Sequence, residues 1–238
     1  MNHGPWYVVH MKLAIVIPAY NEAKMIVEVI KEVRFVTPHV FVVDDGSVDD
    51  TAIVARSADA VVLRHALNRG QGAALRTGIE AAARAGADII VTFDADGQMS
   101  AADIPALTAP IEAGFCDIVL GSRFLTTNDE RLTTKIPLVR RLTLKAALVF
   151  TRATTGLKIT DTHNGLRAFS REAAAALDLR CDRMAHASEI LEEISRLGLK
   201  YREVPVTIKY TDYSLAKGQK LSGAFRIIKD LILSSWMK

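Results

Sequence analysis

The chain has 238 residues, of which 50% are hydrophobic and 24% are charged, and its formal net charge is +3. This length and composition fit one globular domain with a full core. The small net charge does not indicate a nucleic-acid partner, and no apolar run approaches the ~20 residues that span a bilayer. The N-terminus lacks a signal-peptide pattern, and Cys116 and Cys181 lack metal-ligand spacing. We therefore expect a reduced, cytoplasmic protein.

Strand and helix patterns alternate from Leu13 onward. Apolar, β-branched runs predict strands at Leu13–Ile17, Val40–Val43, Ala60–Leu63, Asp88–Phe93 and Asp117–Leu120. Helical periodicity predicts helices at Glu22–Val33, Asp49–Ser57, Gln71–Arg84 and Asp103–Ala113. This alternation is typical of an α/β fold, with a mostly parallel sheet flanked by helices.

Two carboxylates, Asp94 and Asp96, stand one residue apart after the fourth predicted strand. Alternation along a strand would place both on one side, at the sheet edge where open α/β sheets bind ligands. Such carboxylates repel each other unless a cation lies between them, and a divalent ion that also takes substrate phosphates suits the position. Gln98 adds a neutral oxygen. The pattern therefore predicts a metal site, against the alternative of an ordinary turn.

Three further loops are expected at the same edge of the sheet. They cover residues 18–22, 44–51 and 68–74. The second begins with two aspartates, which could accept hydrogen bonds from a ribose or a base. The third has glycines at the start of a helix, where backbone N–H groups could meet an anion. Each loop taken alone could also be a tight turn, with Gly46 at positive φ.

Taken together, the motifs resemble family 2 glycosyltransferases, in the branch of dolichyl-phosphate mannose synthase and bacterial polyprenyl-phosphate glycosyltransferases. The matching segments run from Ile15 to Phe169 and read IVIPAYNE, VVDDGSVDDT, NRGQGAALRTG, TFDADGQM, VLGSRF and DTHNGLRAF. The resemblance implies a GT-A fold, a UDP- or GDP-sugar donor, and Mg²⁺ or Mn²⁺ at the Asp-Ala-Asp motif.

The resemblance also implies roles for individual residues. The nucleoside pocket would be lined by Pro18, Ala19, Tyr20, Glu22 and Asp45, with Asn68 and Gly72 as further donor contacts. The metal and the diphosphate would be held by Asp94, Asp96 and Gln98, and Arg123 would face a phosphate.

The acceptor decides whether a general base is needed. A lipid phosphate is already ionised near neutral pH, whereas a sugar hydroxyl must lose its proton to a carboxylate. Our candidate for that carboxylate is Asp161, with Glu189 in reserve. Asp161 could instead hold the following turn, and Glu189 could be an ordinary polar helix residue. Asn164 and Arg167 are expected on the acceptor side, although Arg167 could equally pair with an acid.

The C-terminal third carries basic amphipathic patterns. Residues 131–160 include no acidic residue and seven basic ones, namely Arg131, Lys135, Arg140, Arg141, Lys145, Arg152 and Lys158. A second such stretch runs from Lys217 to Lys238 and includes Trp236. These patterns predict helices at an anionic membrane surface, with solvated, core-covering helices as the alternative.

One departure from the mannose synthases affects the expected donor. Their EVP strand is present at Glu203–Pro205, but Tyr210 occupies the position of a phosphate-binding arginine. Lys217, with Lys220, would then contact phosphate. This departure disfavours mannose and resembles bacterial relatives that work with small membrane partners.

We therefore predict a single GT-A domain, with a nucleotide-sugar part at 13–123, an acceptor part at 124–218 and an amphipathic helix at 219–238. The expected activity is metal-dependent, inverting sugar transfer to a polyprenyl phosphate, at the cytoplasmic face of the membrane. One alternative is transfer to a glycan hydroxyl in cell-envelope polysaccharide synthesis. Another is a catalytically silent scaffold that binds nucleotide sugars.

Overall fold

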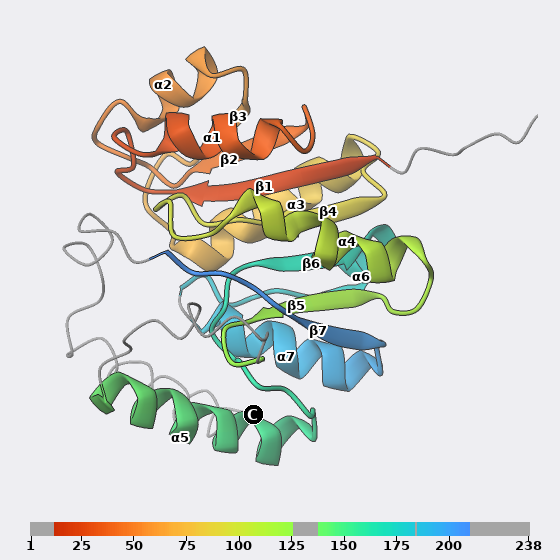
Figure 1. Cartoon of the computed structure of the whole chain (residues 1–238). Helices are drawn as coiled ribbons and strands as arrows, with labels where there is room; N and C mark the ends of the chain where they lie inside the picture. The colour runs from red at the N-terminus through yellow and green to blue at the C-terminus, as the bar shows by residue number, and fades with distance from the viewer. Residues whose placement is uncertain (1–11, 126–137, 184, 210–238) are drawn as a thin grey trace, which may run out of the picture.

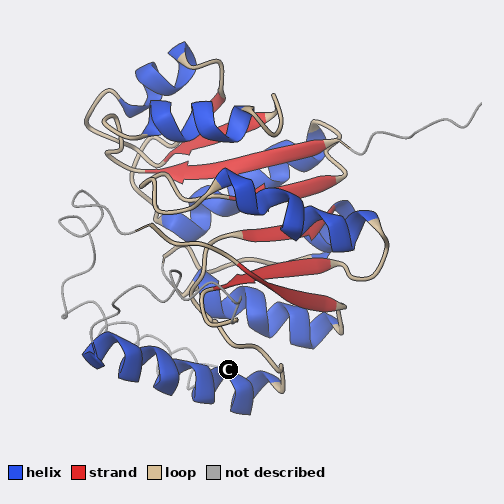
Figure 2. Cartoon of the chain, in the orientation of Figure 1, coloured by secondary structure: helices blue, strands red, loops and turns tan. Residues whose placement is uncertain are grey.

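The computed structural model describes residues 12–125, 138–183 and 185–209, which form a seven-stranded sheet with helices on both faces (Figures 1 and 2). The strands are β1 (Leu13–Ala19), β2 (Val40–Asp44), β3 (Val61–Arg64), β4 (Ile89–Thr92), β5 (Ile118–Ser122), β6 (Arg167–Ser170) and β7 (Tyr201–Pro205). The helices are α1 (Ile26–Arg34), α2 (Thr51–Ser57), α3 (Gln71–Arg84), α4 (Ile104–Glu112), α5 (Leu138–Thr155), α6 (Arg171–Ala176) and α7 (His186–Leu197). A short 3₁₀ turn, η1 (Ala101–Asp103), precedes α4.

The strand order is β3-β2-β1-β4-β6-β5-β7. The first four strands pair in parallel, as the alternation of elements predicts. β6 is inserted antiparallel between β4 and β5, and β7 closes the edge parallel to β5. The mostly parallel sheet is therefore confirmed, and its carboxyl edge carries the loops that follow β1, β2 and β4.

Alternating residues of β1 serve two separate hydrophobic cores. Ile15 and Ile17 face the core that includes α1 and α4, whereas Ala14 and Val16 face the core that includes α3, α6 and α7. α3 approaches β1 closely at Gly78, where an added Cβ would lie 2.3 Å from a methyl carbon of Val16. Burial on both faces explains why the predicted strands read as continuous apolar runs.

The predicted basic helix within residues 131–160 is present as α5, which lies against α7 at the bottom of Figure 1. Its exposed side chains include Val149, Phe150 and Arg152. Among the described helices, none combines the length and hydrophobicity needed to cross a bilayer. The second basic stretch, with Lys217, Lys220 and Trp236, lies outside the described residues.

Candidate functional site

Asp94 and Asp96 lie in the loop after β4. The strand ends at Thr92, so the prediction that strand alternation aligns the two carboxylates is wrong. The chain turns instead at Gly97, where φ is +73°, and the Gln98 backbone N–H donates to Asp96 Oδ1 at 3.0 Å. This turn brings both aspartates to one pocket.

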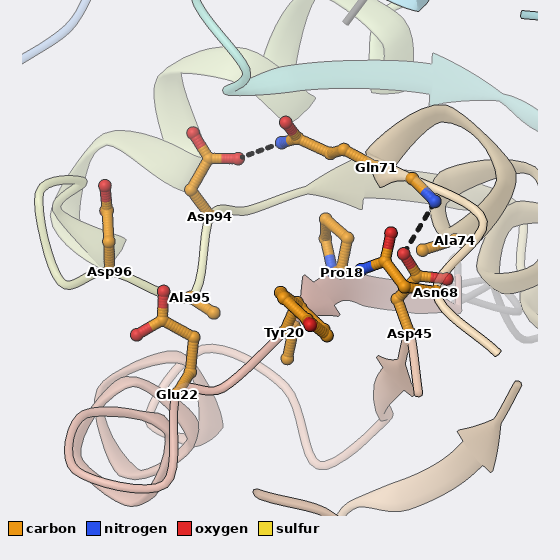
Figure 3. Close-up of a pocket in the computed structure, with 12 residues that line it drawn as sticks. Pro18, Tyr20, Glu22, Asp45, Asn68, Gln71, Ala74, Asp94, Ala95 and Asp96 are labelled. Carbon is orange, nitrogen blue, oxygen red and sulfur yellow. Dashed lines mark hydrogen bonds between the residues drawn. The ribbon is translucent and has the colours of Figure 1, made fainter. Parts of the chain in front are cut away.

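The pocket has a volume of about 340 Å³ and opens at the carboxyl edge of the sheet (Figure 3). Its walls are Pro18, Ala19, Tyr20, Glu22, Asp45, Asn68, Gly70, Gln71, Ala74, Asp94, Ala95 and Asp96. Eight of the residues that the sequence assigned to the donor or the metal thus come together from the end of β1 and from the loops after β1, β2, β3 and β4. Among the described residues, this lining holds four carboxylates and no basic side chain. A diphosphate would be repelled here unless a cation accompanied it.

Two residues that the sequence did not point to, Gln71 and Gly165, lie next to the Asp94 carboxylate. Gln71 Nε2 donates to Asp94 Oδ1 at 3.1 Å, a bond drawn in Figure 3. On another side, a Cβ added at Gly165 would lie 2.8 Å from Asp94 Oδ2. Burial, followed by the charge of Asp96, raises the pKa of Asp94 to about 7. Gln71 and Gly165 both lie in segments that match the family, but only the folded chain shows that they are next to Asp94.

Asp45 lies on the opposite side of the pocket from Asp94 (Figure 3). Its carboxylate accepts hydrogen bonds from the backbone N–H groups of Arg69 and Gly70, at 3.0 and 2.7 Å, and contacts His65 Nδ1 at 2.7 Å. Asp45 therefore shapes the loop after β3 as well as facing the pocket. The neighbouring turn has the predicted positive φ at Gly46, +71°.

Gly72 does not line the pocket. A Cβ at this position would lie 2.0 Å from the carbonyl oxygen of Cys181, so the glycine permits close packing of α3 against the loop before α7. The next backbone N–H, of Ala73, donates to the carbonyl of Asp182 at 3.1 Å. At this part of the helix N-terminus, where the sequence left open an anion site or a tight turn, the Ala73 N–H is occupied by protein.

Arg123 and Asp161 form a two-pronged ion pair beyond the pocket wall. Arg123 Nε and Nη2 donate to Asp161 Oδ2 and Oδ1 at 2.7 and 2.8 Å, and the Asp161 side chain is 1% exposed. Burial alone would raise the pKa of Asp161, but the hydrogen bonds and charge of Arg123 outweigh it and lower that pKa. A carboxylate held in this way is a weak base.

Glu189, the reserve candidate for a general base, lies in the first turn of α7. Its carboxylate accepts hydrogen bonds from the backbone N–H groups of Arg180 and Cys181, at 2.8 and 3.0 Å. Glu189 therefore stabilises the loop at Arg180 and Cys181, which packs against Gly72.

Arg167 and Asn164 are buried beside the site, outside the pocket lining. Arg167 Nε donates to the carbonyl of Asn164 at 2.9 Å, and Nη2 donates to that of Thr162 at 3.1 Å. Burial lowers the pKa of Arg167 to about 10, against the opposing charges of Asp161 and Asp94. Asn164 Oδ1 accepts from Leu166 N–H at 2.9 Å, while its buried Nδ2 has no hydrogen-bond partner among the described residues.

The chain is similar to known glycosyltransferases. The model of the family "Glycosyl transferase family 2" matches residues 14–177. An uncharacterised protein of Methanocaldococcus jannaschii is 39% identical over 93% of this chain and 91% of its own length. The UDP-N-acetylglucosamine–dolichyl-phosphate N-acetylglucosaminyltransferase of Methanococcus voltae is 33% identical over 92% of this chain and 94% of its own.

Among solved structures, the chain is similar to glucosyl-3-phosphoglycerate synthase of Mycobacterium tuberculosis, in complex with Mn²⁺, UDP-glucose and phosphoglyceric acid. The TM-score is 0.71 at 23% identity, covering 94% of this chain and 79% of the other. This likeness confirms the predicted GT-A fold.

Proposed function

This chain belongs to glycosyl transferase family 2 and is a nucleotide-sugar-dependent glycosyltransferase, and we propose that it transfers the sugar to a polyprenyl phosphate with inversion. The acidic pocket at the carboxyl edge of the sheet carries this proposal, because it suits a metal-bound diphosphate. The relative in Methanococcus voltae, named for its dolichyl-phosphate acceptor, supports the choice of lipid.

The donor nucleoside is proposed to lie between Tyr20 and Asp45. Asp45 faces the pocket while it anchors the loop after β3 through its backbone hydrogen bonds. Pro18, Ala19 and Glu22 complete this wall, and Asn68 closes it from the other loop.

Replacing Asp45 by alanine should weaken binding of a nucleoside diphosphate by about tenfold or more, because both the direct acceptor and the loop anchor are lost. Calorimetric titration with UDP and with GDP measures this loss and identifies the base. Asp50→Ala, at the exposed start of α2, is the control. Unchanged affinity in Asp45→Ala would restrict Asp45 to shaping the turn.

A divalent metal fits the residues present. Among the described residues, no group of three or more His, Cys, Asp or Glu side chains could hold an ion. Asp94 and Asp96 would therefore supply two carboxylates, with Gln98 near them, and the donor diphosphate would supply further oxygens, as is usual for Mg²⁺. The bound ion would neutralise charge that develops on the departing diphosphate. Mn²⁺ in the complex of the M. tuberculosis synthase supports the proposal without deciding between Mn²⁺ and Mg²⁺.

Inversion by a single displacement needs no covalent enzyme nucleophile, and an ionised phosphate acceptor needs no strong base. The surroundings of the two carboxylates considered as general bases favour a phosphate acceptor over a hydroxyl acceptor, because neither carboxylate is well placed to take a proton. Asp161 is paired with Arg123, and Glu189 accepts backbone hydrogen bonds. We assign Arg123 to a phosphate and Arg167 to balancing the charge of Asp94.

A product analysis tests the acceptor. The chain is incubated with UDP- and GDP-sugars, undecaprenyl phosphate, and Mn²⁺ or Mg²⁺. We expect one lipid-linked sugar that mild acid releases, because a sugar phosphate is far more acid-labile than a glycoside. Transfer to a soluble glycan alone would support the hydroxyl alternative. Tight donor binding without transfer to any acceptor would support the silent scaffold.

Docking to an anionic membrane is proposed through α5 and the basic C-terminal stretch. The described part of α5 exposes Val149, Phe150 and Arg152 on its surface. Each cation near such a membrane contributes about 1 kcal/mol, and this contribution is screened by salt. A small membrane protein could assist this attachment.

The chain should therefore pellet with anionic vesicles at low salt and partly detach at high salt. Neutral vesicles are the control, and truncation before Leu221 should lower lipid glycosylation more than donor hydrolysis. A chain that stays in the supernatant with anionic vesicles at low salt would contradict membrane docking.

A further inference from the structure

The EVP strand contains a glutamate, Glu203, that reaches the segment carrying Asp161. This segment, residues 158–166, lies in the connection between α5 and β6 and is here named the linker segment. Glu203 Oε1 and Oε2 accept from the backbone N–H of Thr160 at 2.8 and 2.9 Å, and Oε1 also accepts from Asp161 N–H at 3.2 Å. The Thr160 hydroxyl adds a third donor at 3.1 Å. One carboxylate thus fixes two consecutive residues of the linker segment.

The linker segment is joined at the same place to the end of β5. The hydroxyls of Ser122 and Thr160 lie 2.6 Å apart, and the next residue on each side forms the pair of Arg123 and Asp161. β7 lies beside β5, with Glu203 opposite Leu120 in the register. Glu203, Asp161 and Arg123 therefore form one continuous chain of contacts.

Burial raises the pKa of Glu203, against the hydrogen bonds from Thr160 and Asp161. Glu203 is also close enough for its charge to oppose that of Asp161. Pairing of β7 with β5 uses backbone hydrogen bonds and does not require a half-buried carboxylate at this position. The cost of burial points to a positional role for the side chain.

We propose that Glu203 is a positioning residue for Arg123: it fixes the backbone at Thr160 and Asp161, and Asp161 in turn fixes the guanidinium plane of Arg123. The proposal rests on the function proposed above, in which Arg123 contacts a phosphate. Because the bidentate pair sets the orientation of the guanidinium, a small shift of Asp161 turns the donors of Arg123 away from that phosphate.

The chain offers a matched control on the same strand. Tyr201, two residues before Glu203, accepts from the Lys158 N–H of the linker segment at 2.7 Å. Tyr201→Phe removes this acceptor without touching Asp161 or Arg123. Glu203→Gln keeps the shape of the side chain but replaces one of the two oxygens that accept from the Thr160 N–H by an NH₂ donor. A general loosening of the linker segment would affect both variants alike.

Glu203→Gln should lower kcat/KM on undecaprenyl phosphate by about ten- to a hundredfold, as removal of an outer partner does at other sites. Tyr201→Phe should stay within about threefold of the wild type. In an Asp161→Asn background, the effect of Glu203→Gln should shrink to about twofold, because residues that act in series are not additive. A full, additive effect in that background would overturn the proposal.

A second measurement does not depend on the acceptor. The Arg123 Nε–H, which donates to Asp161 Oδ2, is followed by proton exchange in NMR spectra and assigned with Arg123→Lys. Its exchange should accelerate in Glu203→Gln and stay slow in Tyr201→Phe. Wild-type exchange in Glu203→Gln would overturn the proposal whatever the substrate.

These readouts separate the two hypotheses. If the wild type makes no lipid-linked sugar, the proposed function fails, and proton exchange at Arg123 alone decides the role of Glu203. If Glu203→Gln is too unstable to purify, Glu203→Asp replaces it in the comparison with Tyr201→Phe. Aspartate retains the charge, but its side chain is one methylene shorter, so the carboxylate lies farther from the N–H groups of Thr160 and Asp161.

Discussion

Replacing Asp96 by asparagine should reduce sugar transfer by about a hundred- to a thousandfold, comparable to the loss of one transition-state stabilising group in other enzymes. The pocket has four carboxylates and no basic side chain among its described lining residues, so under the proposed function donor binding would depend on a cation held by these carboxylates. An amide carries no charge and leaves the departing diphosphate less compensated. Initial rates at saturating Mn²⁺ measure the loss. Asp59→Asn, at a side chain 83% exposed, is the control.

The same variant should have the opposite effect on the stability of the metal-free chain. The pKa of Asp94 is raised from 3.8 to about 7, first by burial and then by Asp96. Between these values the folded state binds more protons than the unfolded state, so the free energy of unfolding falls as pH rises. Asp96→Asn removes one cause of the shift. Metal-free Asp96→Asn should therefore melt at a higher temperature than the wild type above about pH 7.

Chelator-treated protein in thermal melts at two pH values tests this prediction. Full turnover of Asp96→Asn in chelator-treated buffer would refute the metal assignment. Equal melting temperatures at high pH would show instead that Asp96 adds no strain to the metal-free site.

The parts of the fold that the sequence predicted are those with local signals. Buried strands such as Leu13–Ala19 read as apolar runs, and the site loops follow them directly. β6 has only four residues and begins with an arginine, so its sequence is too short and too polar to form a recognisable hydrophobic pattern. Its antiparallel insertion depends on the neighbouring strands β4 and β5, and no local signal encodes that placement.

The site shows the same division. Asp94 and Asp96 were identifiable because the two carboxylates are close in sequence. Arg123 and Asp161 are 38 residues apart, and no local pattern shows that Arg123 pairs with the carboxylate considered as a base. The contact of Gln71 with Asp94 spans 23 residues and was equally invisible. Motifs predicted which residues gather at the sheet edge, whereas side-chain pairing determines what each of them can do.

A single methyl group added at Gly165 should disturb the proposed metal site, although it changes no charge. A Cβ there would lie 2.8 and 2.9 Å from the two carboxylate oxygens of Asp94, closer than real Cβ contacts. The carboxylate cannot withdraw freely, because it is half-buried and accepts a hydrogen bond from Gln71 Nε2 at 3.1 Å. In Gly165→Ala, Asp94 must shift or the backbone of the linker segment must move.

Either movement would misplace a proposed metal ligand, and displacements near 1 Å cost about a hundredfold in rate. We therefore expect Gly165→Ala to lower both Mn²⁺ affinity, measured by calorimetry, and kcat by about ten- to a hundredfold. Gly114→Ala is the matched control: with φ at +70° and no atom within 4 Å of an added Cβ, it strains the fold away from the site. It should lower the melting temperature and leave Mn²⁺ affinity intact. Wild-type Mn²⁺ affinity in Gly165→Ala would mean that the Asp94 carboxylate has room to move, and that Gly165 does not control the geometry of the site.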